Sequence, residues 1–340
     1  MESTASVQMG FLFSKLALFG FWRTCRTAAL SGFFAIGVQT PGWTAGSWET
    51  RQDLPVPTSG LQASTLEGKI YAVGGQNWND PSLPEATGAL WIYDPVEDRW
   101  SEGASMPTGR IFLDTVAVDG LLYVIGGATQ GVEHAPGLAV VEAYDPKTDS
   151  WTRKADMPTP RADLTVSAAG GKIFAIGGTR NVGVDALTIV EEYDPTTDTW
   201  SRKADMPTPR LHLASGVVED RIYVFGGSPE WPVPLSTTEA YDPVTDTWTT
   251  AANMPTERTG LWAAALAGKI YVMGGVEWDS EALAKVEAYD PVTDAWAAMP
   301  DMPTPRTLFT AAAVGNEIYA IGGATSDFNS LASVEALRPD

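Results

Sequence analysis

Short apolar segments recur along most of the chain, and six of them end in two glycines. In residues 269–275, Lys-Ile-Tyr-Val-Met-Gly-Gly, four apolar residues precede the doublet, as expected of a buried β-strand that ends in a turn. Residues 286–289, Val-Glu-Ala-Tyr, form a short alternating segment typical of a half-buried strand. Residues 290–294, Asp-Pro-Val-Thr-Asp, have the composition of a turn and lead into a strand with Trp296. The pattern therefore predicts an all-β protein built from short antiparallel strands.

The same pattern occurs six times. The first glycines of the doublets, which recur at nearly even intervals, are Gly74, Gly126, Gly177, Gly226, Gly274 and Gly322. A Tyr-Asp-Pro motif follows five doublets, at Tyr93, Tyr144, Tyr193, Tyr241 and Tyr289. A tryptophan lies seven residues after each tyrosine and at a constant distance before the next doublet, at Trp100, Trp151, Trp200, Trp248 and Trp296. Such constant spacing indicates a repeat protein in which each repeat is one structural unit.

These glycines, tyrosines and tryptophans resemble the kelch repeat, and the resemblance covers residues 47–339. It implies a β-propeller in which each repeat forms one blade of four antiparallel strands, named a to d from the centre outward. The repeated tyrosines and tryptophans are then expected to pack between neighbouring blades.

The two ends of the repeat region indicate how the ring closes. Residues 334–339 match the segment that contains Tyr-Asp-Pro, but no strand with a tryptophan follows them. Trp48 precedes Gly74 by the same distance that separates each later tryptophan from its doublet, so positions 47–51 are expected to supply the missing outer strand. The sequence therefore predicts one domain over residues 46–340, a six-bladed propeller closed by its N-terminal strand, which leaves no open sheet edge. We expect this closed ring to be monomeric.

The first 45 residues have a different character. Two apolar runs, 10–22 and 28–38, flank a basic cluster at 23–26, and neither run is long enough to span a bilayer. A basic stretch, an apolar run and then a polar, turn-prone segment is the order found in secretory signal peptides. Residues 1–45 are therefore expected to be a signal peptide or another targeting segment, with the protein periplasmic or extracellular. A short membrane anchor or a retained extension is the alternative.

Charge and composition narrow the possible ligands. The 340 residues include 22 Lys and Arg against 42 Asp and Glu, a net charge of −20. A chain this acidic repels phosphate groups, so we expect no nucleic-acid binding and no membrane binding beyond the leader. Cys25, His134 and His212 are the only cysteine and histidines, too few for a zinc site, a disulfide framework or a Cys–His nucleophile in the folded body. We therefore expect no metal and no cofactor.

Length differences between repeats are confined to the segment between the second glycine and the tyrosine position, which is longest in the first repeat and shortest in the last three. In an up-and-down blade these segments are the loops between strands b and c, and they emerge on the same side as the connections from d to the next a. We call this side the b–c loop face and expect it to bind the ligand, because variable loops on a rigid scaffold commonly do.

The b–c loops combine aromatic, acidic and amide side chains, which suit stacking on and hydrogen bonding to a sugar or a peptide. The candidate ligand-binding residues are Trp78, Asp80, His134, Arg180, Trp231, Trp278 and Phe328. Alternatively, each tryptophan folds onto its own blade and anchors its loop.

An arginine lies ten residues after each of the five repeated tryptophans, and a glutamate lies two residues before each tyrosine position from the second repeat onward. Five arginines near the channel would suit an anion. However, the first repeat has Thr58 and Trp91 at these positions and so lacks both partners, as expected if they pair within a blade. The predicted structural pairs are Arg110–Glu142, Arg161–Glu191, Arg210–Glu239, Arg258–Glu287 and Arg306–Glu335.

Asp163 and His212 depart from the repeat pattern. Each lies two residues after an arginine, on adjacent blades, where the other repeats have Gly60, Phe112, Gly260 or Leu308. A carboxylate and an imidazole at the channel mouth suit acid–base chemistry. The alternative is that both are solvated or hydrogen-bonded there without a catalytic role.

Two functions follow from these observations. The first is an exported, non-enzymatic kelch propeller that binds a protein, a peptide or a glycan on the b–c loop face. The alternative is a sugar mutarotase or epimerase similar to the N-acetylneuraminate epimerases. That resemblance implies acid–base chemistry at the channel mouth, for which Asp163, His212, Arg161 and Arg210 are the candidate residues.

Overall fold

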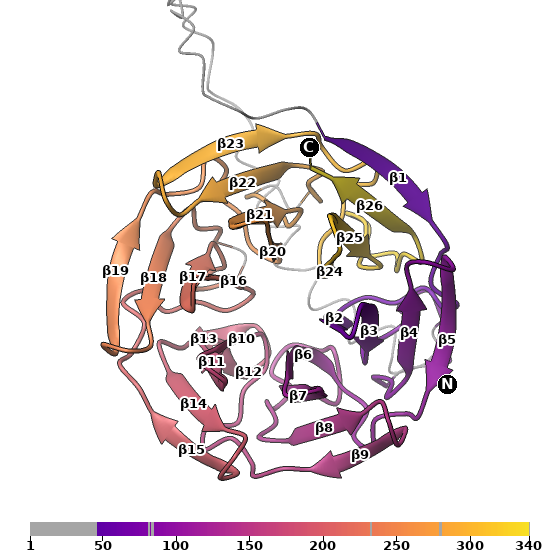
Figure 1. Cartoon of the computed structure of the whole chain (residues 1–340), viewed down its shortest axis with the longest axis horizontal. Helices are drawn as coiled ribbons and strands as arrows, with labels where there is room; N and C mark the ends of the chain where they lie inside the picture. Colours follow the sequence, from indigo (N-terminus) through magenta and orange to yellow (C-terminus); the bar gives the residue numbers. More distant parts are fainter. Residues whose placement is uncertain (1–45, 81, 83–84, 232, 279–280, 340) are drawn as a thin grey trace, which may run out of the picture.

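The chain forms six four-stranded sheets arranged around a central axis (Figure 1). The structure is a computed structural model that describes residues 46–80, 82, 85–231, 233–278 and 281–339. The predicted targeting segment, 1–45, lies outside the described residues. No helix within the described ranges has the length and apolar character needed to span a bilayer.

Each blade runs from an inner to an outer strand. Blade 1 contains β2 (Gln62–Leu66), β3 (Lys69–Val73), β4 (Leu90–Asp94) and β5 (Arg99–Gly103). Blade 2 contains β6 (Ile111–Val118), β7 (Leu121–Ala128), β8 (Val141–Asp145) and β9 (Ser150–Arg153). Blade 3 contains β10 (Thr165–Ala169), β11 (Lys172–Ile176), β14 (Val190–Asp194) and β15 (Thr199–Arg202), with an extra hairpin of β12 (Thr179–Asn181) and β13 (Val184–Ala186).

The remaining blades follow the same order. Blade 4 contains β16 (Ala214–Val218), β17 (Arg221–Phe225), β18 (Thr238–Asp242) and β19 (Thr247–Ala251). Blade 5 contains β20 (Trp262–Leu266), β21 (Lys269–Met273), β22 (Val286–Asp290) and β23 (Ala295–Met299). Blade 6 contains β24 (Thr310–Val314), β25 (Glu317–Ile321), β26 (Val334–Arg338) and β1 (Ser47–Arg51). The predicted six-bladed, all-β propeller is confirmed.

The N-terminal strand closes the ring, as predicted. β1 pairs antiparallel with β26, with Trp48 opposite Leu337, so the two ends of the domain share one sheet. The next residue after β1, Gln52, is held by blade 1: its N–H donates to Asp98 Oδ1 at 2.8 Å, and its carbonyl accepts from the Trp100 indole at 2.9 Å. This N-terminal segment of the propeller therefore joins blade 6 to blade 1.

The repeated tyrosine, aspartate and tryptophan form the same joint between blades. In blade 2, the Tyr144 hydroxyl donates to Asp149 Oδ1 at 2.7 Å, and that oxygen accepts the N–H of Ala104 in blade 1. The Trp151 indole donates to the carbonyl of the same Ala104 at 2.7 Å. Blades 1, 3, 4 and 5 each repeat these three bonds onto the preceding blade. The constant spacing of the repeat is therefore the spacing of an interblade contact.

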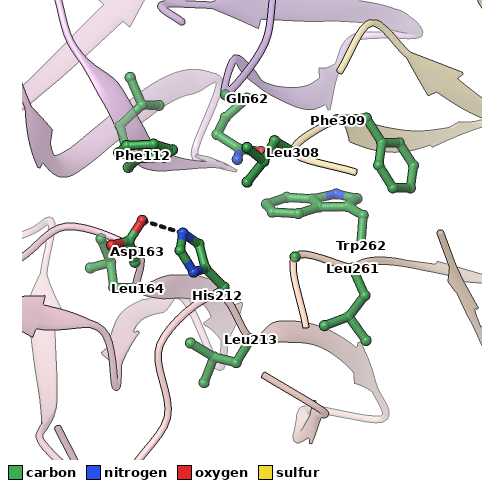
Figure 2. Close-up of a pocket in the computed structure, with 13 residues that line it drawn as sticks. Gln62, Phe112, Asp163, Leu164, His212, Leu213, Leu261, Trp262, Leu308 and Phe309 are labelled. Atoms are coloured by element: carbon green, nitrogen blue, oxygen red, sulfur yellow. Dashed lines mark ion pairs between the residues drawn. The ribbon is translucent and has the colours of Figure 1, made fainter. Parts of the chain in front are cut away.

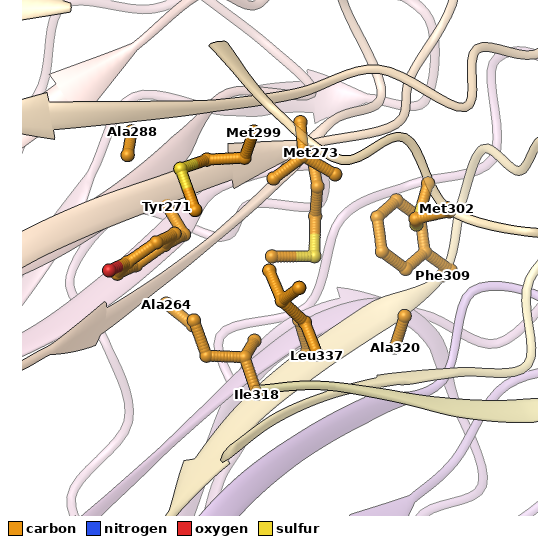
Figure 3. Packing of buried hydrophobic residues seen from close by; sticks show 12 residues of the cluster. Ala264, Tyr271, Met273, Ala288, Met299, Met302, Phe309, Ile318, Ala320 and Leu337 are labelled. Atoms are coloured by element: carbon orange, nitrogen blue, oxygen red, sulfur yellow. The ribbon is translucent and has the colours of Figure 1, made fainter. Parts of the chain in front are cut away.

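Apolar side chains fill the space between adjacent blades. Between blades 5 and 6, Met273 and Tyr271 pack with Ile318, Phe309 and Leu337 (Figure 3). Each of these side chains is almost completely buried, and burying one of this size stabilises the fold by about 1.5–3 kcal/mol. This core makes the ring a rigid frame for the residues at its centre.

Candidate functional site: the channel mouth

The five predicted arginine–glutamate pairs are present in the structure, and the arginine side chains have no exposed surface. The nearest Nη2 and Oε2 atoms are 2.8 Å apart in Arg110–Glu142 and Arg161–Glu191, and 2.9 Å apart in Arg306–Glu335. Arg210–Glu239 and Arg258–Glu287 make the same contact.

Each arginine is also bonded to the backbone of its blade. Arg161 Nη1 donates to the carbonyls of Gly177 and Ile189, both at 2.9 Å. The first glycine of the doublet and the residue before strand c thus accept bonds from the guanidinium. Burial lowers the pKa of Arg161 to about 10, while Glu191 opposes that shift, so the guanidinium stays charged at neutral pH.

A threonine two residues before each arginine completes these pairs. The sequence interpretation missed this threonine. Thr159 Oγ1 donates to Glu191 Oε1 at 2.7 Å, so both carboxylate oxygens have a partner. The same bond recurs from Thr108, Thr208, Thr256 and Thr304. The recurrence of Thr-x-Arg in the same five repeats was the signal available in the sequence.

The burial of these pairs corrects one expectation about catalysis. Arg161 and Arg210 were candidates for acid–base chemistry at the channel mouth. Both are fully buried against glutamates and neither lines the central cavity. These arginines therefore cannot contact a ligand there, and an anion ring at the mouth is excluded for the same reason.

The centre of the b–c loop face is formed by an inner ring of six equivalent residues, one per blade: Gly60, Phe112, Asp163, His212, Gly260 and Leu308. Their backbones are linked around the axis, since Asp163 N–H donates to the Phe112 carbonyl at 2.9 Å and His212 N–H donates to the Asp163 carbonyl at 3.0 Å. The bonds from Gly60, Gly260 and Leu308 continue this chain.

All six residues of the inner ring have left-handed backbone conformations, with φ between 50° and 64°. Glycine adopts this region freely, and Asp and His tolerate it, but Phe112 and Leu308 are strained there. The interblade bonds hold this conformation and fix where each side chain starts. The inner ring therefore sets the geometry of the channel mouth.

The inner ring brings Asp163 and His212 together. Asp163 Oδ1 lies 2.9 Å from His212 Nε2, and the two side chains are 0% and 11% exposed (Figure 2). The contact is close but poorly aligned: neither carboxylate oxygen and neither ring nitrogen has a hydrogen-bond partner among the described residues. Buried polar atoms without partners are costly, so they commonly mark a place for a ligand or water.

Aromatic rings surround this pair. The His212 ring lies 5.8 Å from Phe112 and 5.0 Å from Trp231, centroid to centroid, with edge-to-face geometry in both cases. Trp231 comes from the b–c loop of blade 4, so that loop reaches the channel mouth. Trp262 lies across the cavity from Asp163 (Figure 2), and its indole N–H is bound to the Ala311 carbonyl at 2.9 Å.

Phe112, Asp163, His212 and Trp262 are among the residues that line a cavity of about 40 Å³ at the channel mouth. The cavity is lined by inner-ring residues and by the first residues of the inner strands, including Gln62 and Trp262. Gln62 is buried, and its Oε1 has no hydrogen-bond partner among the described residues. The side chains of Asp163 and Gln62, which carry these oxygens without hydrogen-bond partners, therefore line one small cavity together with His212.

A buried acid that the sequence interpretation missed lies in the inner strand of blade 2. Asp114, in β6, accepts the N–H of Val166 at 2.6 Å and the Thr165 hydroxyl at 3.3 Å, which links blade 2 to blade 3. Burial raises the pKa of Asp114 to about 7, although these hydrogen bonds oppose the shift. The signal in the sequence was a carboxylate at an inner-strand position where the other repeats have Gln62, Thr165, Ala214, Trp262 and Thr310.

The structure separates the predicted b–c loop residues into anchors and exposed groups. Trp78 packs against Phe328 in a tilted arrangement, with ring centroids 6.0 Å apart, and its backbone N–H donates to the Ser330 hydroxyl. These two aromatic residues therefore join the loops of blades 1 and 6. Asp80 is held within its own loop by the N–H and hydroxyl of Ser82, which lower its pKa.

The remaining loop candidates are exposed and lie apart from the cavity lining. Trp278 is 52% exposed, and its indole N–H donates to Glu257 Oε1 at 2.7 Å. Arg180 is exposed on the extra hairpin of blade 3, and His134 is exposed near Glu133. Trp231 is the loop candidate whose ring packs against a residue of the inner ring. No group of three or more metal-ligating side chains is clustered within the described ranges.

Comparisons with known proteins agree with this architecture. Residues 114–323 match the family described as the KLHDC2/KLHL20/DRC7 Kelch-repeats domain, and residues 57–107 match the Kelch motif. The solved structure of YjhT is similar with a TM-score of 0.72 at 17% identity, covering 83% of this chain and 95% of that one, which shows the shared fold.

Curated relatives are similar over shorter stretches. Kelch-like protein 25 of Xenopus tropicalis is 33% identical over 134 residues, which are 38% of this chain and 22% of that protein. The F-box/kelch-repeat protein At1g22040 of Arabidopsis thaliana is 30% identical over 146 residues, 41% of this chain and 29% of that protein. The matched part is thus under a third of either relative. Because the match at 114–323 alone covers more than half of the sequence, this chain belongs to the kelch-repeat family.

Proposed function

We propose that this chain is an exported recognition module that binds a protein partner on its b–c loop face, around the channel mouth. Kelch propellers typically serve as protein-interaction modules. The observation that carries the proposal is the cavity at the centre of this face, which holds unpartnered polar atoms within a rim of aromatic rings. Among the described residues, the opposite face consists of the short, uniform turns that follow strands a and c.

Exposed residues of the b–c loops provide the test of the binding face. Trp278→Ala and Arg180→Glu both change exposed side chains outside the core, so the fold is expected to remain intact. Val244→Ala is the matched control, because Val244 is 92% exposed in a Tyr-Asp-Pro turn on the opposite face.

Cross-linking of the purified chain to the secretome of its own organism, followed by titration calorimetry with the recovered protein, measures binding. We expect the two loop variants to weaken affinity at least tenfold and Val244→Ala to leave it unchanged. Equal affinity for all three would reject the b–c loop face. If the chain binds a glycan on an array and no protein partner is recovered, the ligand of this face is a glycan and not a protein.

The export proposal rests on the order of basic, apolar and turn-forming residues within 1–45. Cell fractionation with N-terminal sequencing of the mature protein tests it. We expect the protein outside the cytoplasm with an N-terminus near residue 46. A cytoplasmic protein that retains Met1 would contradict export while leaving the binding proposal standing.

A second candidate function, acid–base chemistry on a sugar, is favoured by one observation. Asp163 and His212 form a close, buried carboxylate–imidazole contact in a cavity that opens on the loop face. NMR measurement of anomer exchange and epimerisation in N-acylated sugars, with Asp163→Asn as control, tests it. Equal rates for the unchanged chain, the variant and buffer would exclude this activity.

A further inference from the structure

We propose that the channel-mouth cavity binds the cationic head group of its ligand, an ammonium or a guanidinium. In a protein partner this group is the side chain of a lysine or an arginine. The inference deepens the proposed function, on which it rests only for the source of the cation.

Unpartnered hydrogen-bond acceptors outnumber donors in the cavity. Both carboxylate oxygens of Asp163 and the Oε1 of Gln62 are buried without hydrogen-bond partners among the described residues. The two ring nitrogens of His212 can together supply at most two N–H donors, fewer than these three oxygens. A ligand group that carries several N–H donors would satisfy these atoms, whereas a carboxylate or phosphate would add more acceptors.

The charge of the lining residues also favours a cation over an anion. Asp163 is the only Asp, Glu, Lys or Arg among the lining residues, and the other titratable side chain there is His212, whose Nε2 lies 2.9 Å from Asp163 Oδ1. The nearby arginines Arg161 and Arg210 are buried in ion pairs with their own glutamates, so they do not neutralise the charge of Asp163. The net charge of −20 adds a field that attracts cations to the molecule.

Aromatic rings complete a site for an organic cation. Phe112 and Trp262 line the cavity, and Trp231 packs against His212 beside it. The faces of such rings attract ammonium and guanidinium groups, and the attraction increases where water is excluded. Because the Trp262 indole N–H is already bound to Ala311, its ring is held in place for such a contact.

The size of the cavity indicates a head group. A volume of about 40 Å³ accommodates a few water molecules, well below the hundreds of Å³ typical of sites that enclose a whole ligand. The tip of a side chain fits this space, while the rest of a partner would lie on the surrounding loops.

Titration with small probes tests the cavity without a protein partner. The probe is N-acetyl-arginine methylamide, and the control is its citrulline analogue, which has nearly the same shape but no charge. Binding to the full-length chain is followed by NMR of the tryptophan indole and histidine ring signals. We expect the arginine probe to shift the Trp262 and His212 signals and to bind at least tenfold more tightly than the citrulline analogue.

Substitutions locate the probe. Asp163→Asn keeps the left-handed backbone and is expected to weaken arginine binding at least tenfold, and Gln62→Leu is expected to weaken it several-fold. Asp290→Asn, which removes an acid from a turn on the opposite face, is expected to leave binding unchanged. Thermal melting of each variant shows that it is folded. Equal binding of the two probes, or unchanged binding by Asp163→Asn, would overturn the proposal.

Additional measurements separate this inference from the proposed function. Glucosamine compared with N-acetylglucosamine shows whether an amino sugar, instead of a side chain, is the source of the cation. If a protein partner binds the loop face but the arginine probe does not bind, the cation site is rejected and the binding module stands. If the probe binds but the loop variants leave partner binding unchanged, the proposed function fails and the cation site stands.

Discussion

Two contacts between an acid and a base begin only two residues apart on blade 3, at Arg161 and Asp163. Their burial, hydrogen bonding and recurrence among the blades differ. Arg161–Glu191 recurs in five blades, is fully buried, and both carboxylate oxygens have partners. Asp163–His212 occurs once, borders a cavity, and has four polar atoms without a hydrogen bond among the described residues. Among the described residues, the paired arginines Arg161, Arg210 and Arg258 each have one nitrogen, Nε, without a hydrogen-bond partner.

The difference shows how a repeat fold separates structure from recognition. A contact that repeats with the blades holds each blade to its own loops, so it belongs to the scaffold. A contact that departs from the repeat and lacks hydrogen-bond partners contributes little to that scaffold. The strained left-handed conformations of Phe112 and Leu308 lie in the same inner ring, where strain is often associated with function.

The largest expected effect is on a buried pair. Glu239→Ala leaves the Arg210 guanidinium buried without its counter-charge, so we expect the free energy of unfolding to fall by ~3–5 kcal/mol. Urea unfolding measures it. Glu230→Ala, at an exposed glutamate of the same blade, is the control, and its effect should stay within about 0.5 kcal/mol.

Replacing both members of a pair sharpens this test. Arg258→Met combined with Glu287→Leu removes the two charges together, so we expect most of the loss caused by either single substitution to be recovered. A double substitution that is less stable than both single variants would show that the bonds from Arg258 to the backbone, rather than the ion pair, dominate.

The next effect concerns pH and Asp114. Its pKa of about 7 in the folded chain exceeds the ordinary 3.8, so folding favours the protonated form. This stabilising contribution is complete below about pH 4, is lost as pH rises through 7, and amounts to about 4 kcal/mol. Unfolding of the unchanged chain and of Asp114→Asn from pH 4 to 8 measures it. The same pH slope in both proteins would contradict the assignment.

A smaller effect is expected for the threonine that completes a pair. Thr208→Val keeps the side-chain shape but removes the 2.8 Å hydrogen bond to Glu239 Oε1, so a loss of ~1–2 kcal/mol is expected in urea unfolding. Thr245→Val, at an exposed turn of the same blade, is the comparison. If the two substitutions cost the same, the hydroxyl does not support the buried pair.

The smallest effect on stability is expected at the channel mouth. Asp163→Asn and His212→Asn keep residues that tolerate the left-handed backbone, and they remove a contact that is poorly hydrogen-bonded. We expect the free energy of unfolding of each variant to be within about 1 kcal/mol of the value for the unchanged chain, either equal to it or slightly above it. Thermal and urea unfolding measure this. A loss as large as that of Glu239→Ala would place Asp163–His212 in the scaffold.

Several features of the fold were readable from the sequence because the repeats supply internal comparison. The spacing from Trp48 to Gly74 identified the closing strand, and the joint loss of partners at Thr58 and Trp91 identified the arginine–glutamate pairs. Both rest on regular geometry within or between blades. Length variation in the b–c loops pointed to the face that contains the cavity.

The sequence did not separate ligand-binding groups from anchors, because that distinction depends on contacts between loops of different blades. Trp78 of the first blade packs against Phe328 of the last, whereas Trp278 remains exposed. Asp114 was missed because its bonds to Thr165 and Val166 cross from one blade to the next. Arg161 and Arg210 were placed near the mouth, but only packing shows that they are sealed from it.

By itself, the sequence determined the number of blades, the closure of the ring and the pairing of its buried charges, since all three follow from a period that is nearly constant along the chain. Only the tertiary structure decided which side chains share the central cavity. The closed ring brings Gln62, Asp163, His212 and Trp262 from four blades to one axis. Their unpartnered atoms become apparent only when every neighbour around that axis is in place.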